Sequence, residues 1–110
     1  MVTHMENMVW SKKEKQIARQ AFNKAYKNEV TDIMNKAKDR LHTLENPKEI
    51  WELHDFLTDK RDETDNKYDY RYSVLILVFS RLINEGWITM DDLKGLGEDK
   101  ITKINQVLKL

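Results

Sequence analysis

The sequence predicts an all-α fold, in which a long two-helix stalk forms an antiparallel-type dimer and a small helical head follows at the C-terminal end. Its 110 residues include one proline and three glycines, so few positions interrupt a helix. Charged residues make up 35% and hydrophobic residues 40% of the chain, which is the profile of a helical soluble protein. Apolar residues also recur in steps of three and four over the first half of the chain. We expect residues 1–10 to be a disordered tail, residues 11–64 to be the dimerising stalk and residues 65–110 to be the head.

The first helix is predicted over residues 11–44, which contain neither glycine nor proline. Ser11 and Glu14 have the spacing of a capping box at its start. Such a helix would be about 50 Å long at 1.5 Å per residue, which is longer than a compact domain of this size is wide. A second copy of the chain is the simplest cover for its apolar stripe. We therefore expect a homodimer with a contact at Ile33, Met34 and Ala37.

The second helix is predicted from Pro47 to about Thr64. Asn46 is a favourable N-cap, proline suits the first helical position, and Glu49 completes a capping box. The proline also disfavours helical geometry at Asn46, so the chain is expected to turn there. The two long helices together form the predicted stalk.

One face of this second helix combines a tryptophan with charged residues. At about 100° per residue, its apolar positions gather in one stripe, Ile50, Leu53 and Leu57. Trp51 and Asp55 fall on the opposite side, and His54 and Arg61 flank them. Because Trp and Arg are enriched at binding hot spots, we take Trp51, His54, Asp55 and Arg61 as the candidate binding residues. The alternative is that a second layer of the fold covers Trp51.

The head is predicted to contain a buried helix and two shorter ones. The run V-L-I-L-V-F at residues 74–79 suits a strand as well as a helix, but no other segment offers a strand to pair with it. We predict a buried helix from about Asn66 to Glu85, with Gly86 as its left-handed C-terminal cap. A short helix is expected at Thr89–Asp92, and a last helix carries the apolar residues Ile101, Ile104, Val107 and Leu108.

Catalytic and metal sites are not expected. The chain has no cysteine and no glycine-rich loop, and its three histidines lack the spacing of metal ligands. We therefore predict no enzymatic activity, no metal and no cofactor. The longest apolar run has six residues, too few to span a bilayer, and the N-terminus lacks the basic and apolar regions of a secretory signal. A cytoplasmic location without membrane insertion follows as the expectation.

Charge is unevenly distributed along a chain that is neutral as a whole. Residues 11–44 carry nine basic and four acidic residues, whereas residues 45–110 carry ten basic and fourteen acidic ones. This pattern favours antiparallel packing within the chain or between subunits. A nucleic-acid-binding helical dimer is the runner-up class, but zero net charge and dispersed basic residues argue against it.

Several stretches of the sequence carry a family resemblance. They are F-N-K-A-Y at 22–26, W-E-L-H-D-F-L at 51–57, K-R-D-E-T-D-N-K-Y-D at 60–69, S-V-L-I-L-V-F at 73–79 and E-G at 85–86. On these motifs the chain resembles the fluorescence recovery protein family of cyanobacteria from about Trp10 to Leu110. The combination W-x-L-H-D-F-L-x-x-K-R is specific, because no packing rule requires that order of residues.

The resemblance implies an all-helical dimer that regulates photoprotection. Such proteins bind the light-activated red form of the orange carotenoid protein, chiefly through its C-terminal domain. They accelerate its return to the orange form and promote its release from the phycobilisome, which ends non-photochemical quenching. The family's binding patch corresponds here to Trp51, His54, Asp55 and Arg61, and its dimer contact to the region of Ile33 and Met34. The resemblance also implies a location in the cytoplasm or at the cytoplasmic face of the thylakoid membrane.

Two positions in the head depart from the family pattern. The family often has an aromatic residue where this chain has Leu77, and an acidic one where it has Tyr70. These departures put any contact between the head and the carotenoid protein in question. The alternative function is a dimeric helical adaptor for a different protein partner.

Overall fold

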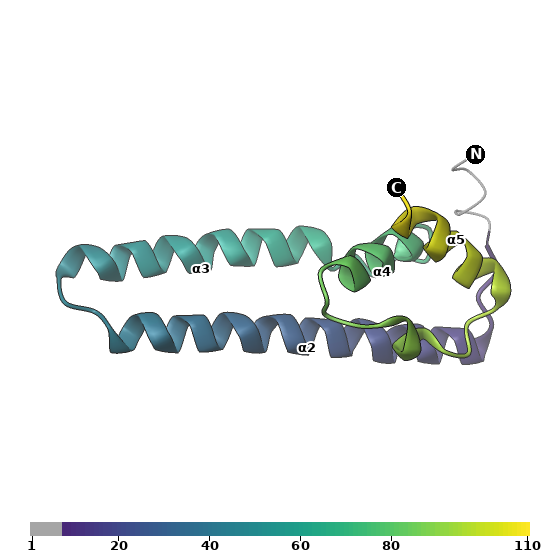
Figure 1. The fold of residues 1–110 in the computed structure, drawn as a ribbon, viewed down its shortest axis with the longest axis horizontal. Coiled ribbons are helices and arrows are strands. Elements are labelled where there is room, and N and C mark those ends of the chain that lie inside the picture. Colours follow the sequence, from purple (N-terminus) through teal and green to yellow (C-terminus); the bar gives the residue numbers. More distant parts are fainter. Residues whose placement is uncertain (1–7) are drawn as a thin grey trace.

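The computed structural model describes residues 8–110 and contains no β-strand among them. Helices α2 (Lys12–His42) and α3 (Pro47–Lys67) lie side by side in antiparallel orientation and are joined by a short turn. Helix α4 (Leu75–Asn84), the 3-10 helix η1 (Met90–Leu93) and α5 (Glu98–Leu108) gather at the opposite end, against the first half of α2. The result is an elongated molecule of 53 × 24 × 24 Å (Figure 1). The prediction of an all-α fold with a long stalk and a helical head is confirmed.

Helix α2 begins as the capping box predicts. The Glu14 backbone N–H donates to the Ser11 hydroxyl at 3.1 Å, and the Glu14 carboxylate accepts from the Ser11 backbone N–H at 2.9 Å. The helix then runs for 31 residues, about 46 Å at 1.5 Å per residue. Its C-terminal residues Arg40 and His42 complement the negative end of the helix dipole. Residues 1–7 of the predicted tail lie outside the described residues, and Trp10 belongs to the buried core.

The predicted single helix over residues 66–85 is wrong, because the structure divides it into two. Helix α3 continues to Lys67, α4 starts only at Leu75, and residues 68–74 between them form no regular helix. The reason is the alternation of the sequence D-Y-R-Y after Tyr68. Tyr68 and Tyr70 are half-buried against aromatic residues of α2, and Tyr72 is half-buried against Trp10. Asp69 and Arg71 form an ion pair with each other at 2.5 Å. Burying every second residue requires an extended backbone rather than a helical one.

The core lies at the head end of the molecule, where α4, η1 and α5 pack against the first half of α2. Its largest fully buried side chains are Phe79, Leu75, Ile76, Leu82, Leu93 and Ile104. Small residues on α2 complete this core, namely Ala18, Ala21 and Ala25. The V-L-I-L-V-F segment forms most of α4, so the preference for a buried helix over a strand at these residues is confirmed. Gly86 takes φ +86° directly after the helix, where only glycine is unstrained.

The outer part of the stalk has almost no buried side chains. Between Val30 and Asn66, only Leu53 and Thr64 are buried. Large apolar side chains remain exposed along the same stretch, and they are Met34, Leu41, Ile50, Trp51 and Leu57. The two helices of the stalk therefore leave apolar surface available to another molecule.

Candidate protein-interaction site

The four candidate binding residues lie together on the exposed side of α3. The Trp51 side chain is 67% exposed, and no part of residues 8–110 covers it. His54, Asp55 and Arg61 are exposed as well. The second-layer alternative for Trp51 therefore does not apply within the described chain. A large aromatic surface in water, at the centre of polar groups, is typical of a binding hot spot.

The polar groups around Trp51 make only weak contacts within the chain. His54 Nδ1 lies 3.4 Å from Asp55 Oδ1, and the imidazole meets the Trp51 ring edge-on at 6.3 Å between centroids. Arg61 Nε lies 3.7 Å from Asp65 Oδ2, which is too far for a hydrogen bond. Because these side chains are exposed and loosely held, their donors and acceptors are accessible to a partner. The arrangement suits charge-assisted recognition rather than bond chemistry.

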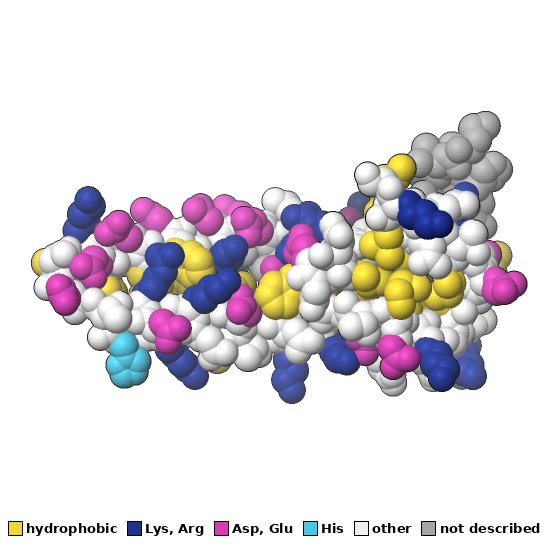
Figure 2. Space-filling view, in the orientation of Figure 1, with side chains coloured by type: hydrophobic (Ala, Val, Ile, Leu, Met, Phe, Trp, Pro, Cys, Tyr) yellow, Lys and Arg dark blue, Asp and Glu magenta, His cyan; other side chains and the backbone are white. Residues whose placement is uncertain are grey.

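The face of α3 that turns inward is only partly covered. Leu53 is buried, but Ile50 and Leu57, which share its predicted stripe, remain 40% and 39% exposed. Phe56 is half-buried beneath the Arg40 guanidinium of α2, at 4.2 Å from its ring centroid. Apolar side chains thus border the Trp51 surface on its helix. Figure 2 shows acidic side chains along the α3 edge of the stalk and a larger apolar patch on the head.

The predicted dimer residues lie on the outer half of α2. Ile33 and Ala37 are half-buried within the chain, and Met34 is 52% exposed. Leu41, two turns further along the helix from Met34, is also largely exposed. Met34 and Leu41 keep apolar surface accessible on the outer half of α2. The dimer contact stays a prediction.

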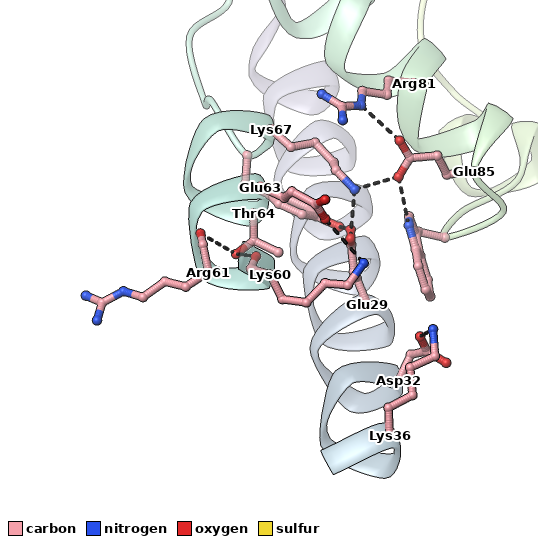
Figure 3. A network of polar contacts seen from close by, with 12 residues as sticks. Glu29, Asp32, Lys36, Lys60, Arg61, Glu63, Thr64, Lys67, Arg81 and Glu85 are labelled. Atoms are coloured by element: carbon pink, nitrogen blue, oxygen red, sulfur yellow. Dashed lines mark hydrogen bonds and ion pairs between the residues drawn. The ribbon is translucent and has the colours of Figure 1, made fainter. Parts of the chain in front are cut away.

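A buried ion-pair network at the junction of stalk and head was not predicted. The Lys67 ammonium at the end of α3 donates to Glu29 Oε2 of α2 at 2.7 Å and to Glu85 Oε1 after α4 at 2.5 Å. The Tyr68 hydroxyl donates to Glu29 at 2.8 Å, and the Trp87 indole N–H donates to Glu85 at 3.1 Å. Figure 3 shows Lys67 with Glu29 and Glu85. We call Glu29, Lys67 and Glu85 the junction cluster.

Local electrostatics favour the charged forms of Lys67 and Glu85 in the junction cluster. Burial alone would lower the pKa of Lys67, but hydrogen bonds and charge interactions with Glu29 and Glu85 outweigh it and raise that pKa. Burial likewise favours a higher pKa for Glu85, but Lys67 and Arg81 hold it below the usual value of a glutamate. The sequence contained a signal, since Thr64 and Lys67 continue the heptad-like spacing of Leu53 along the inner face of α3. A lysine at such a position needs buried partners.

A second buried pair closes the far end of the head. Glu14 of α2 accepts hydrogen bonds from the Gly97 backbone N–H at 2.7 Å and from the Lys100 ammonium at 3.1 Å. Burial alone would raise the pKa of Glu14, but the N–H donors of Ser11 and Gly97 and the Lys100 ammonium lower it to about 2. This pair ties the start of α2 to the start of α5.

The two departures from the family pattern occupy different environments. The Tyr70 ring packs edge-on against Phe22, with 4.8 Å between centroids, and the Arg19 guanidinium lies over it at 3.5 Å. Leu77 is 48% exposed beside a shallow hollow of about 230 Å³ between α4 and α5. Tyr70 therefore has a packing role, whereas Leu77 contributes to the apolar surface of the head.

Residues 8–110 offer neither a cluster of metal ligands nor a membrane-crossing helix. This part of the chain contains no group of three or more His, Asp and Glu residues that could hold a metal ion. None of its helices combines the length and the apolar composition needed to cross a membrane.

Comparison with known proteins gives a consistent result. Residues 10–108 match the family model described as photoprotection regulator fluorescence recovery protein. The fluorescence recovery protein of Synechocystis sp. PCC 6803 is 39% identical over 101 residues, which cover 92% of this chain and 93% of that protein. The solved structure of the Fremyella diplosiphon fluorescence recovery protein superposes on this chain with a TM-score of 0.87, and the two sequences are 44% identical. The solved structure of the Synechocystis protein gives a TM-score of 0.88 at 38% identity. Each comparison covers 93% of this chain and the whole of the solved chain.

Proposed function

The chain belongs to the fluorescence recovery protein family of photoprotection regulators, and on that premise we propose that it acts on the orange carotenoid protein. It binds the light-activated red form through that protein's C-terminal domain and accelerates the return to the orange form. It thereby promotes release of the carotenoid protein from the phycobilisome and ends non-photochemical quenching. This activity takes place in the cytoplasm, at the cytoplasmic face of the thylakoid membrane.

The observation that carries this proposal is the exposure of Trp51 on α3, beside His54, Asp55 and Arg61. Because the Trp51 side chain is 67% exposed, it contributes little to folding of the chain, and its large apolar surface suits a binding role. Trp51 supplies a large apolar area, Asp55 supplies an acceptor about one turn further along α3, and Arg61 supplies a multi-donor fork about three turns further along. Together they suit a partner surface with an apolar pocket bordered by charged groups.

The mechanism needs no covalent chemistry. Trp51 docks in the apolar pocket, while Asp55 and Arg61 fix the register through charge-assisted hydrogen bonds. A binder accelerates a conformational return when it holds the transition state more tightly than the starting red form. The binder shifts the equilibrium between the red and orange forms only to the extent that it binds one of them more tightly than the other. Turnover then requires that the compact orange form be released.

We also propose that the active form is a homodimer with Ile33, Met34 and Ala37 in the contact. The exposed strip of Met34 and Leu41 on α2 and the partly covered Ile50 and Leu57 on α3 support this proposal. A second copy that covered them would bury apolar area that the single chain leaves in water, at about 25 cal/mol per Å². Trp51 lies on the other side of α3 from that stripe, so it can stay accessible in the dimer.

The test is the rate of red-to-orange recovery of purified orange carotenoid protein in the dark, with and without this chain. Acceleration by substoichiometric amounts of the chain is the expected result, because a catalyst of the conformational change is released after each event. The Trp51→Ala variant serves as the matched control. No acceleration by a folded wild-type chain would contradict the proposal and favour a dimeric adaptor for a different protein partner.

A further inference from the structure

Lys67 is the one residue of α3 that forms an ion pair with another helix in the described part of the chain. The other ion pairs of α3 join residues of the same helix, such as Lys60 with Glu63 and Arg61 with Asp65. Thr64 is buried, but its hydroxyl donates to carbonyl oxygens of its own helix at 2.9 and 3.0 Å. Directional contacts between α3 and the rest of the molecule are therefore concentrated at its C-terminal residue.

The junction cluster joins three elements at one point. Glu29 lies in the middle of α2, Lys67 ends α3, and Glu85 follows α4. The side chains of Lys67 and Glu29 are 4% and 6% exposed, so this pair is screened from water. Figure 3 shows the Lys67 ammonium between the two carboxylates, whereas Arg61 of the same helix points away from them.

The cluster also reaches the surface of the head. Glu85 Oε2 accepts from Arg81 Nε at 2.9 Å, and Arg81 lines the hollow between α4 and α5 beside Leu77. A continuous series of charged contacts thus leads from α3 through Lys67 and Glu85 to Arg81. The exposed surface of the head and the helix that carries Trp51 meet at this cluster.

We propose that Lys67 is a positioning residue for the binding helix: its ammonium, shared between Glu29 and Glu85, fixes α3 and the Trp51 surface in one orientation relative to the head. This inference rests on the proposed function, because it assigns the orientation a role in binding the carotenoid protein. Lys67 acts through α3 and does not itself touch the partner.

The junction cluster contributes more to the orientation of α3 than to the stability of the fold. A buried ion pair often contributes no more to folding than apolar or neutral groups of the same volume. Its hydrogen bonds are directional, however, and an ammonium that must serve two carboxylates admits few placements of α3. The apolar contacts that remain along α3, with Leu53 as the buried residue, tolerate sliding and rotation much better.

The decisive variant removes the charges and keeps the volume. In Glu29→Gln/Lys67→Met/Glu85→Gln no buried charge is left without a partner, and the two introduced amide side chains can still accept from Tyr68 and Trp87. The control is Lys67→Met alone, which leaves two carboxylates facing each other and should lower the melting temperature. The neutral triple variant should melt close to the wild type.

Orientation is measured by double electron–electron resonance between spin labels on Asp59→Cys in α3 and Gln106→Cys in α5. Both positions are exposed, and the chain has no native cysteine to interfere. Labelled chains are mixed with an excess of unlabelled chains, so that distances within one chain dominate. We expect a single narrow distance distribution in the wild type and a broadened or shifted one in the neutral triple variant.

The same variants are then compared for dark recovery of the carotenoid protein. The neutral triple variant should need about tenfold more protein for the same acceleration, a size typical of coupling between separate sites. A narrow, unshifted distribution in the triple variant would overturn the positioning role, and so would unchanged acceleration. Failure of the wild-type chain to accelerate recovery would instead contradict the proposed function, and the distance measurement would still decide whether Lys67 positions α3.

Discussion

The head and the outer stalk are built from the same kind of helix but differ in how their apolar side chains are covered. The head buries Leu75, Ile76, Phe79 and Leu82 of a single helix within one chain. The outer stalk, over more than thirty residues, buries only Leu53 and Thr64. The head therefore covers its apolar side chains within one chain, together with the first half of α2, whereas the outer stalk leaves apolar side chains exposed.

Truncation in the head should have the largest effect. Phe79→Ala removes a fully buried ring, and we expect the free energy of unfolding to fall by about 3–5 kcal/mol. Leu77→Ala, on the same helix but 48% exposed, is the matched control and should cost less than about 1 kcal/mol. Urea denaturation followed by circular dichroism measures both. Equal losses in the two variants would contradict the assignment of the core.

Loss of the Lys67 charge should rank second. Lys67→Met leaves Glu29 and Glu85 without their shared cation, and we expect a cost of about 3–5 kcal/mol, near the lower end because Glu85 is partly exposed. Differential scanning calorimetry at neutral pH measures this loss. Adding Glu29→Gln and Glu85→Gln to the same chain should restore most of the stability. A triple variant as unstable as Lys67→Met would mean that the charges themselves hold the junction together.

A charge in the exposed strip of α2 should act on assembly rather than on the fold. Met34→Asp places a carboxylate in the proposed dimer contact, and the dissociation constant should rise about a hundredfold, equivalent to roughly 2.7 kcal/mol. Light scattering at micromolar concentration gives the mass. Asn35→Asp is the control, because it adds the same charge at a neighbouring exposed position about 100° around the helix. A Met34→Asp chain that stays dimeric would remove this residue from the interface.

The sequence predicted the elements that depend on local signals. The Ser11–Glu14 capping box and the Asn46–Pro47 turn are decided by residues within one helical turn, so the starts of α2 and α3 are predicted correctly. The capping box predicted at Asn46 and Glu49 is wrong, because the Asn46 side chain makes no cap hydrogen bond and donates to Glu49 at 2.9 Å. The predicted break between the second and third helices, near residue 65, is too early and too short, because Tyr68, Tyr70 and Tyr72 are assigned to the third helix. The alternation of these tyrosines can be interpreted only when the structure shows that Tyr68 and Tyr70 pack against aromatic residues of α2.

Spacing places Lys67 on the inner face of α3, but it does not identify the partners of Lys67 in the junction cluster. Lys67 and Glu29 are 38 residues apart in the sequence, so no local pattern connects them. The exposure of Trp51, in contrast, followed from the helical projection of residues 50–62, because the inner face was already occupied by Leu53. The side of a helix that faces solvent is easier to predict than the residues of other helices that its buried side contacts.

The contribution of Glu14 should appear only in acid. Because its pKa is lowered from 4.5 to about 2 in the folded chain, its stabilising effect is complete above pH 4.5 and is lost as the pH falls toward 2. We expect the difference in stability between the wild type and Glu14→Gln to be constant from pH 5 to 7 and to vanish near pH 2. Urea denaturation at a series of pH values measures it. A difference that does not depend on pH would contradict the assigned ion pair with Lys100.

The central claim is that the stalk binds its partner through a surface that folding does not use. The most direct measurement is the affinity of Trp51→Ala for the red form of the orange carotenoid protein, taken together with the melting temperature of the variant. We predict an unchanged melting temperature and a loss of about 2 kcal/mol or more in binding, roughly thirtyfold in the dissociation constant. Unchanged affinity in a folded variant would contradict the claim, and so would a fall in melting temperature large enough to account for the lost binding.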